Sequence, residues 1–119
     1  MTIETVKGDE YSVEYNDGTQ SVNFVGTIRL QTTEEYEPIT KLLHNAHNMA
    51  DPAQAVTLDF RQLRFLNSSG INIISRFVIA ARKENRVNLT VLGNQDIYWQ
   101  QKSLTNLQRL WSKVQIKIQ

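Results

Sequence analysis

The segment of residues 56–84 constrains the fold most, because it joins a buried strand to a long helix within a few residues. Residues 55–60 form a mostly apolar run rich in β-branched and aromatic side chains, which is typical of a buried strand. After a predicted short loop at 61–66, the sequence Asn-Ser-Ser-Gly at 67–70 favours a helix N-terminus, and helical periodicity continues to about Glu84. A strand that leads into a crossover helix indicates an α/β fold with parallel strands.

The remaining segments supply the other elements of such a fold. Residues 11–15 and 22–30 alternate between apolar and polar side chains on either side of a turn-forming Asn-Asp-Gly sequence, which predicts a β-hairpin. We further predict helices at 34–50 and around 104–114, and strands at 88–92 and 115–118. We therefore expect one α/β domain over residues 1–119, with a mixed, mostly parallel sheet of about four or five strands, an N-terminal hairpin and three helices, at least two of them on one face.

Charge and composition exclude several classes of function. The formal net charge is only +1, which provides no field that would attract nucleic acid or an anionic membrane. The chain has no cysteine, so it has neither disulfides nor thiolate chemistry, and no apolar run approaches the roughly 18 residues that span a bilayer. No secretory signal is visible, and we expect a cytoplasmic protein without membrane insertion.

No catalytic or cofactor-binding pattern is evident. The sequence contains neither a GxxxxGK-type phosphate loop nor a GxGxxG motif, and no histidine–aspartate pair accompanies the serines, so we expect no enzyme activity and no cofactor. His44 and His47 have an i, i+3 spacing but no HExxH-type motif, and they are expected to lie exposed without a metal. Tyr98 and Trp99 are expected to have a packing role rather than to stack on bases.

The turn Asn67-Ser68-Ser69-Gly70 carries the clearest functional signal. It places two hydroxyl groups at a helix N-terminus beside the carboxyl end of a strand, the edge of an α/β sheet that favours ligands. The unpaired backbone N–H groups and the dipole of the helix favour an anion there. A phosphate on Ser68, with a charge of roughly −1.5 to −2, would change the surface that a partner meets without refolding the domain. Helix capping by the same residues is the alternative interpretation, and the two are compatible.

These residues resemble the STAS family (sulfate transporter and anti-sigma-factor antagonist), in particular its anti-sigma-factor antagonists. In that family a strand, a short loop with an apolar pair and an Asp-Ser-Ser-Gly turn open a long helix. The matching parts here are VTLDF, RQLRFL, the 67–70 turn and the pattern IxxIxxFVxAA. The resemblance covers roughly residues 10–118 and is sharp over about 56–84. It maps the family's phosphoacceptor onto Ser68, the second serine onto Ser69 and the helix-opening glycine onto Gly70.

The resemblance implies a bacterial regulator of transcription that works by partner switching. Unmodified, such a protein binds an ATP-dependent serine kinase that is also an anti-sigma factor, and this binding frees the sigma factor. Phosphorylation breaks the complex, and a phosphatase restores it. We therefore expect phosphorylation at Ser68. The expected partner surface comprises Asn67, Ser69, Gly70, Ile73, Arg76 and Phe77.

Two features leave alternatives open. Asn67 stands where the family usually has aspartate, so a second hypothesis is a STAS scaffold that is never phosphorylated, as a subunit of a signalling or lipid-transport complex. Ile73 and Phe77 either form an exposed apolar patch, with a basic rim that includes Arg76, or are buried because the helix packs on two sides. The oligomeric state is also open, with a homodimer as one option.

Overall fold

The computed structural model describes residues 3–119, and its strands form one six-stranded sheet in the order β1-β2-β3-β4-β5-β6. The strands are β1 (Ile3–Lys7), β2 (Tyr11–Asn16), β3 (Ser21–Ile28), β4 (Val56–Leu66), β5 (Leu89–Gly93) and β6 (Val114–Ile118). The helices are α1 (Thr33–Asn48), α2 (Ser68–Glu84), α3 (Tyr98–Thr105) and α4 (Leu107–Leu110). The pairs from β1 to β3 are antiparallel and those from β3 to β6 are parallel. Met1 and Thr2, which the expected domain includes, lie outside the described residues.

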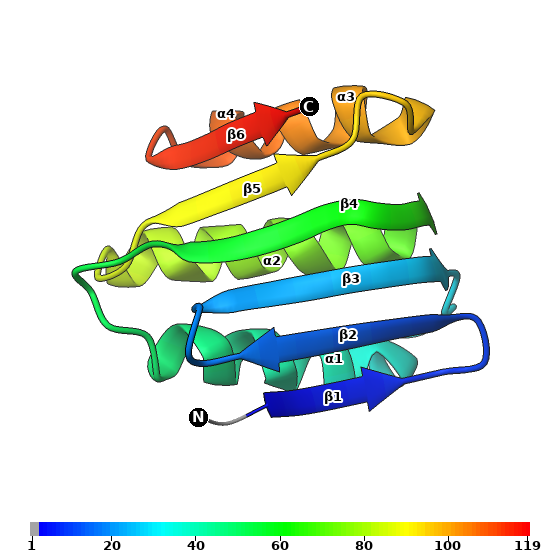
Figure 1. Ribbon diagram of the computed structural model, residues 1–119, viewed down its shortest axis with the longest axis horizontal. Helices are drawn as coiled ribbons and strands as arrows, with labels where there is room; N and C mark the ends of the chain where they lie inside the picture. The colour runs from blue at the N-terminus through cyan, green and yellow to red at the C-terminus, as the bar shows by residue number, and fades with distance from the viewer. Residues whose placement is uncertain (1–2) are drawn as a thin grey trace.

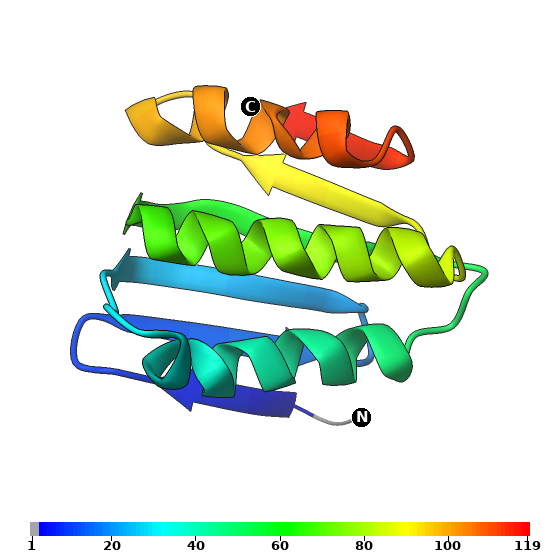
Figure 2. The same cartoon turned by 180° about the vertical axis from the view of Figure 1, so that it is seen from behind.

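All the described helices cover the same face of the sheet. Figure 1 shows the sheet in front of the helices, and Figure 2 shows the helix layer from behind, with α2 between α1 and the α3–α4 pair. Each parallel connection from β3 to β6 adds the next strand in the same direction, so right-handed crossovers place every helix on one side. This agrees with the prediction for at least two helices. None of the helices within residues 3–119 combines the length and apolar character needed to cross a membrane.

The predicted α/β class, the N-terminal hairpin and the mostly parallel sheet are confirmed, with differences in single elements. β1 is an edge strand that the sequence pattern does not predict. Residues 61–66, predicted as a loop, instead continue β4, which pairs with β3 through two register shifts. Leu63 and Leu66 are both buried although they are three positions apart, and such a bulged strand lacks the period of two that would reveal it. Val114 begins β6 rather than ending the last helix.

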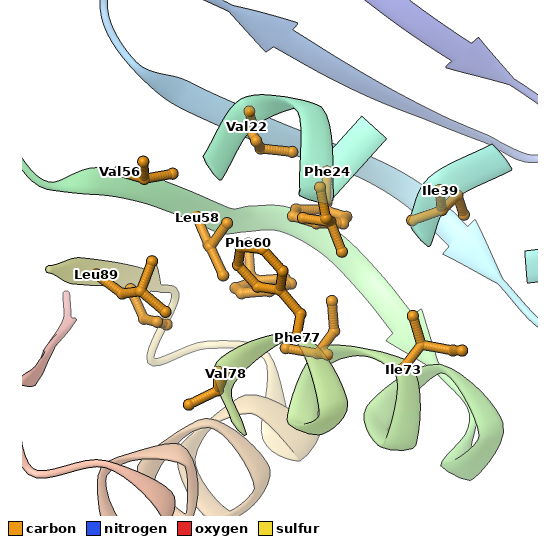
Figure 3. Packing of buried hydrophobic residues seen from close by; sticks show 14 of the residues in the cluster. Val22, Phe24, Ile39, Val56, Leu58, Phe60, Ile73, Phe77, Val78 and Leu89 are labelled. Atoms are coloured by element: carbon orange, nitrogen blue, oxygen red, sulfur yellow. The ribbon is translucent and has the colours of Figure 1, made fainter. Parts of the chain in front are cut away.

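The core lies between the sheet and the helix layer. Phe24 of β3 and Phe60 of β4 stack with their ring centroids 4.5 Å apart. Figure 3 shows Ile73 and Phe77 on the side of α2 that faces these strands. Their exposed fractions are only 7% and 3%, so the expectation that they form an exposed apolar patch is wrong. The alternative holds instead, because α2 packs against the sheet on one side and contacts its neighbouring helices on others.

His47 is buried, contrary to the expectation that both histidines lie exposed. Its ring meets Phe77 edge-on at a centroid distance of 6.0 Å, and its Nδ1 atom lies 3.7 Å from a carboxylate oxygen of Glu84. Its Nε2 atom has no hydrogen-bond partner among the described residues. Burial and the charge of Arg86 lower the pKa of His47, and Glu84 opposes them only in part. Within residues 3–119, no cluster of three metal-ligating side chains includes His44 or His47.

We expect this histidine to make the fold sensitive to acid. Because the pKa of His47 is below its ordinary value of 6.5 in the folded state, the unfolded chain takes up the proton first as the pH falls. The free energy of unfolding should therefore decrease as the pH falls below about 6.5. Urea unfolding at pH 7.5 and pH 5.0 measures the difference. The His47→Leu variant should lose this difference, whereas His44→Gln, at an exposed position of α1, should keep it. An unchanged difference in His47→Leu would show that other groups cause it.

Candidate functional site

Asn67 forms the N-cap of α2, as the capping interpretation predicts. Its backbone is extended, and its side-chain Oδ1 accepts a hydrogen bond from the backbone N–H of Gly70 at 3.0 Å. The amide group also makes two contacts outside the helix. Its Nδ2 donates to the carbonyl oxygen of Leu30 at 2.8 Å, and its Oδ1 accepts from the hydroxyl of Tyr36 at 2.5 Å. A single side chain thus fixes the start of α2 to the segment before α1 and to α1 itself.

Tyr36 is a site residue that sequence reasoning missed. Its side chain is buried, and burial raises the pKa of its hydroxyl to about 12, so the group stays protonated and donates to Asn67. Tyr36 lies three residues before Ile39 on the buried stripe of α1, so its burial follows from helical periodicity. The target of its hydroxyl does not, because Asn67 is 31 residues away in the sequence.

Gly70 allows the first turn of α2 to pack directly on its neighbours. A Cβ atom at this position would lie 2.2 Å from Cδ1 of Leu66 and 2.7 Å from the hydroxyl oxygen of Tyr36. Both distances are far below van der Waals contact, so any side chain here would force Leu66, Tyr36 or the helix itself to move. Gly70 is buried and therefore shapes the site by close packing rather than by surface contact.

Ser68 and Ser69 have different surroundings. Ser68 is the first residue of α2 and is exposed, whereas Ser69 is half-buried. Neither hydroxyl makes a hydrogen bond to any of residues 3–119, so the described structure offers no base that would activate either serine as a nucleophile. Their positions are those of a modifiable hydroxyl at the positive end of a helix dipole.

A small pocket lies beside Ser69, between α1 and α2. Its volume is about 90 Å³. It is lined by Gln31, Thr33, Ser69, Asn72 and Arg76, together with the buried side chains of Tyr36 and Ile73. Ser69 and Arg76 of the expected partner surface therefore line one pocket. Ile73 and Phe77 face the core instead, and the exposed apolar side chain of α2 is Ile79, which sequence reasoning did not select.

The two aromatic residues at the start of α3 have different roles. Trp99 packs as predicted: its ring lies edge-on to Phe60 at a centroid distance of 6.5 Å, and its Nε1 donates to the carbonyl oxygen of Leu63 at 3.2 Å. Tyr98 is 96% exposed, so the expectation that it has a packing role is wrong. Tyr98 opens α3 and points away from the core that its neighbour fills.

Comparison with known proteins gives a likeness in fold. No protein-family model and no curated protein matches the sequence. Apo-SiaC of Pseudomonas aeruginosa matches with a TM-score of 0.72 and 14% identity over 100% of this chain and 99% of that one. An anti-sigma factor antagonist from Mycobacterium paratuberculosis matches with a TM-score of 0.54 and 18% identity over 96% of this chain and 86% of that one. The chain has a STAS-like fold.

A third match is a complex. In the crystal structure of the diguanylate cyclase SiaD with its activator SiaC from Pseudomonas aeruginosa, the matching chain has a TM-score of 0.70 and 14% identity over 98% of this chain and 99% of that one. At these identities the likeness establishes the STAS-like fold.

Proposed function

We propose that the protein is a non-enzymatic regulatory binding module whose association with a signalling protein is controlled by phosphorylation of Ser68. The observation that carries this proposal is the exposed Ser68 hydroxyl, free of hydrogen bonds to residues 3–119, on the first residue of a 17-residue helix. Asn67 performs the capping, so Ser68 has no capping role that modification would disturb.

A phosphate at this position would act through the surface. The helix dipole and the free N–H groups of the first turn stabilise a charge of roughly −2 at Ser68. The backbone around it is held by Asn67 on one side and by the close packing of Gly70 on the other. A rigid support of this kind favours a change in charge at the surface over a rearrangement of the fold, and such a change weakens an interface that has desolvated the serine.

The partner is a signalling protein, and two classes of signalling protein are candidates. The resemblance to anti-sigma-factor antagonists favours a serine kinase that is also an anti-sigma factor, with a phosphatase that removes the phosphate. In this form the protein regulates transcription in the cytoplasm of a bacterium. SiaC is described as the activator of the diguanylate cyclase SiaD, and a structural likeness of 14% identity makes a nucleotide-cyclising enzyme the second form. Both forms use the surface around Asn67, Ser68, Ser69 and Arg76.

A scaffold that is never phosphorylated is the second candidate function. Asn67 favours it, because the family's usual aspartate is missing next to the acceptor serine. The structure shows a specific use for the amide, since Nδ2 donates to Leu30 and a carboxylate has no hydrogen to offer there. The amide is therefore explained by local structure under either function.

Phosphorylation of Ser68 is tested with the chain's own serines as controls. After incubation with native lysate and ATP, peptide mass spectrometry should find phosphate on Ser68 in the wild type and in Ser69→Ala, and none at this site in Ser68→Ala. The partner recovered on the unmodified protein should bind Ser68→Glu about tenfold more weakly, as expected for a like charge placed in an interface. Absence of phosphate with a stable, ATP-insensitive complex would replace this function by the scaffold. Equal affinity of Ser68→Glu and wild type would show that Ser68 is no switch.

A further inference from the structure

We propose that the pocket between α1 and α2 binds a carboxylate side chain of the partner protein, with Arg76 as its counter-charge. This inference rests on the proposed function, because it takes the surface around Ser68 as the partner surface. It names the chemistry of the group that the partner inserts. The inference also gives a physical reason why a phosphate on Ser68 would release that partner.

The pocket has the size and lining of a site for one polar side chain. With a volume of about 90 Å³, it admits a few non-hydrogen atoms and no extended ligand. Thr33 and Ser69 contribute hydroxyl groups, and Gln31 and Asn72 contribute amides, all able to donate hydrogen bonds. None of the lining residues is acidic. The lining therefore offers donors and one positive charge, which a carboxylate matches.

Arg76 supplies a positive charge to the pocket. Its exposed guanidinium makes no ion pair and no hydrogen bond with any residue that the structure describes. Of the acidic residues at the start of α1, Glu35 accepts from backbone N–H groups of the capping segment and Glu37 lies 3.4 Å from Lys41. Glu34 is not among the residues that line the pocket. An unpaired arginine beside donors is suited to bidentate recognition of a carboxylate.

Two other hollows contain an arginine, but each also contains an acidic side chain. A hollow of about 320 Å³ on the open face of the sheet contains Arg61, but Asp59 pairs with it at 2.8 Å. A neighbouring hollow of about 560 Å³ contains Arg64 together with Asp96. In both cases an acidic side chain of the protein already lines the same space. The pocket at Arg76 is therefore the better site for a carboxylate from outside.

The pocket and the phosphorylation site are adjacent. Ser69 lines the pocket, and Ser68 precedes it at the distance of one peptide unit, about 3.8 Å between Cα atoms. A phosphate on Ser68 would therefore lie one residue from a side chain that lines the pocket, at the same end of α2, where the screening length at physiological salt is about 8 Å. The phosphate would repel an incoming carboxylate. Release of the partner then follows from charge repulsion at this end of α2, without movement of the helix.

The pocket is testable without the partner, with a blocked amino acid as the probe. We would titrate isotope-labelled protein with N-acetyl-glutamate N-methylamide at low ionic strength and follow the amide signals by NMR. Signals of Ser69, Asn72 and Gln31 should shift, and the glutamine analogue of the probe should leave them unchanged. The Arg76→Gln variant should lose the response. Arg64→Gln, which removes an exposed arginine elsewhere, should keep it. Ser68→Glu should weaken probe binding about fivefold, as expected for a like charge inside the screening length.

Equal shifts with the glutamine analogue, or an undiminished response in Arg76→Gln, would overturn the proposal. The outcome is separable from that of the proposed function, because neither kinase nor partner takes part. If Ser68 receives no phosphate in native lysate but the glutamate probe occupies the pocket, the switch fails and the carboxylate site stands. If Ser68 is phosphorylated but the probe does not bind, the switch stands and the partner uses other chemistry.

Discussion

Replacement of Gln100 by leucine is expected to lower the free energy of unfolding by about 3–5 kcal/mol, because the carbonyl of Phe60 and the N–H of Asn94 lose their side-chain partner and the carbonyl of Leu63 keeps only Trp99. Gln100 is fully buried in α3, with an exposed fraction of 0%. Its Nε2 donates to the carbonyl oxygens of Phe60 and Leu63 at 2.5 and 2.9 Å, and its Oε1 accepts from the backbone N–H of Asn94 at 2.7 Å. One amide therefore joins the bulged part of β4 to the end of β5.

The size of this effect follows from the bulge itself. Between Asn23 and Val25, the register of β3 against β4 shifts, so part of the backbone of β4 leaves the regular ladder. The side chain of Gln100 satisfies the carbonyl groups that face the helix layer there. Leucine has a similar volume but no donor, and each buried group left unpaired costs about 1–3 kcal/mol.

Two further variants sharpen this prediction. Gln100→Glu keeps the shape but places carboxylate oxygens against two carbonyl oxygens, so at neutral pH it should destabilise at least as much as leucine. Gln101→Leu changes the exposed neighbour in the same helix and should alter stability by less than about 0.5 kcal/mol. Urea unfolding monitored by circular dichroism measures all three. A loss of less than about 1 kcal/mol in Gln100→Leu would mean that water replaces the amide.

Gln100 also shows which parts of this fold can be predicted from the sequence. The helix start at 67–70 was predictable because Asn67 and Gly70 act within one turn of the chain. The continuation of β4 through 61–66 was not, since its buried positions follow a bulge that depends on β3 and on an amide 37 to 40 residues further along. Local capping is encoded in four residues, whereas a bulge is fixed by distant partners.

The same distinction applies to the candidate site. The sequence places Ser68 and Ser69 at the helix N-terminus, and the structure agrees. It cannot choose which stripe of α2 faces the sheet, because both stripes are apolar, and so it leaves open whether Ile73 and Phe77 are exposed or buried; the structure buries both. The pocket beside Arg76 needs α1 and α2 side by side, a relation that no local pattern contains.

Substitution of Asn67 by alanine is expected to lower the free energy of unfolding by about 2–4 kcal/mol, the sum of a lost cap and of partly buried groups left unpaired. The variant removes the acceptor for the N–H of Gly70 and for the hydroxyl of Tyr36, and the donor for the carbonyl of Leu30. Asn72→Ala is the matched control, because Asn72 lies exposed on α2 and makes no hydrogen bond among residues 3–119. Its stability should stay within about 0.5 kcal/mol of the wild type.

The Asn67→Asp variant separates the two roles of this side chain. Aspartate keeps an oxygen for the N–H of Gly70 and for the hydroxyl of Tyr36, and its charge suits the N-terminus of α2. It has no hydrogen for the carbonyl of Leu30, which then faces a carboxylate oxygen at the position where Nδ2 now donates at 2.8 Å. We expect the free energy of unfolding to fall by about 1–2 kcal/mol relative to the wild type, which is less than the fall expected for Asn67→Ala. If urea unfolding finds Asn67→Asp as stable as the wild type, the donor to Leu30 is dispensable. Asparagine at this position would then have to be explained by what meets the surface of Ser68.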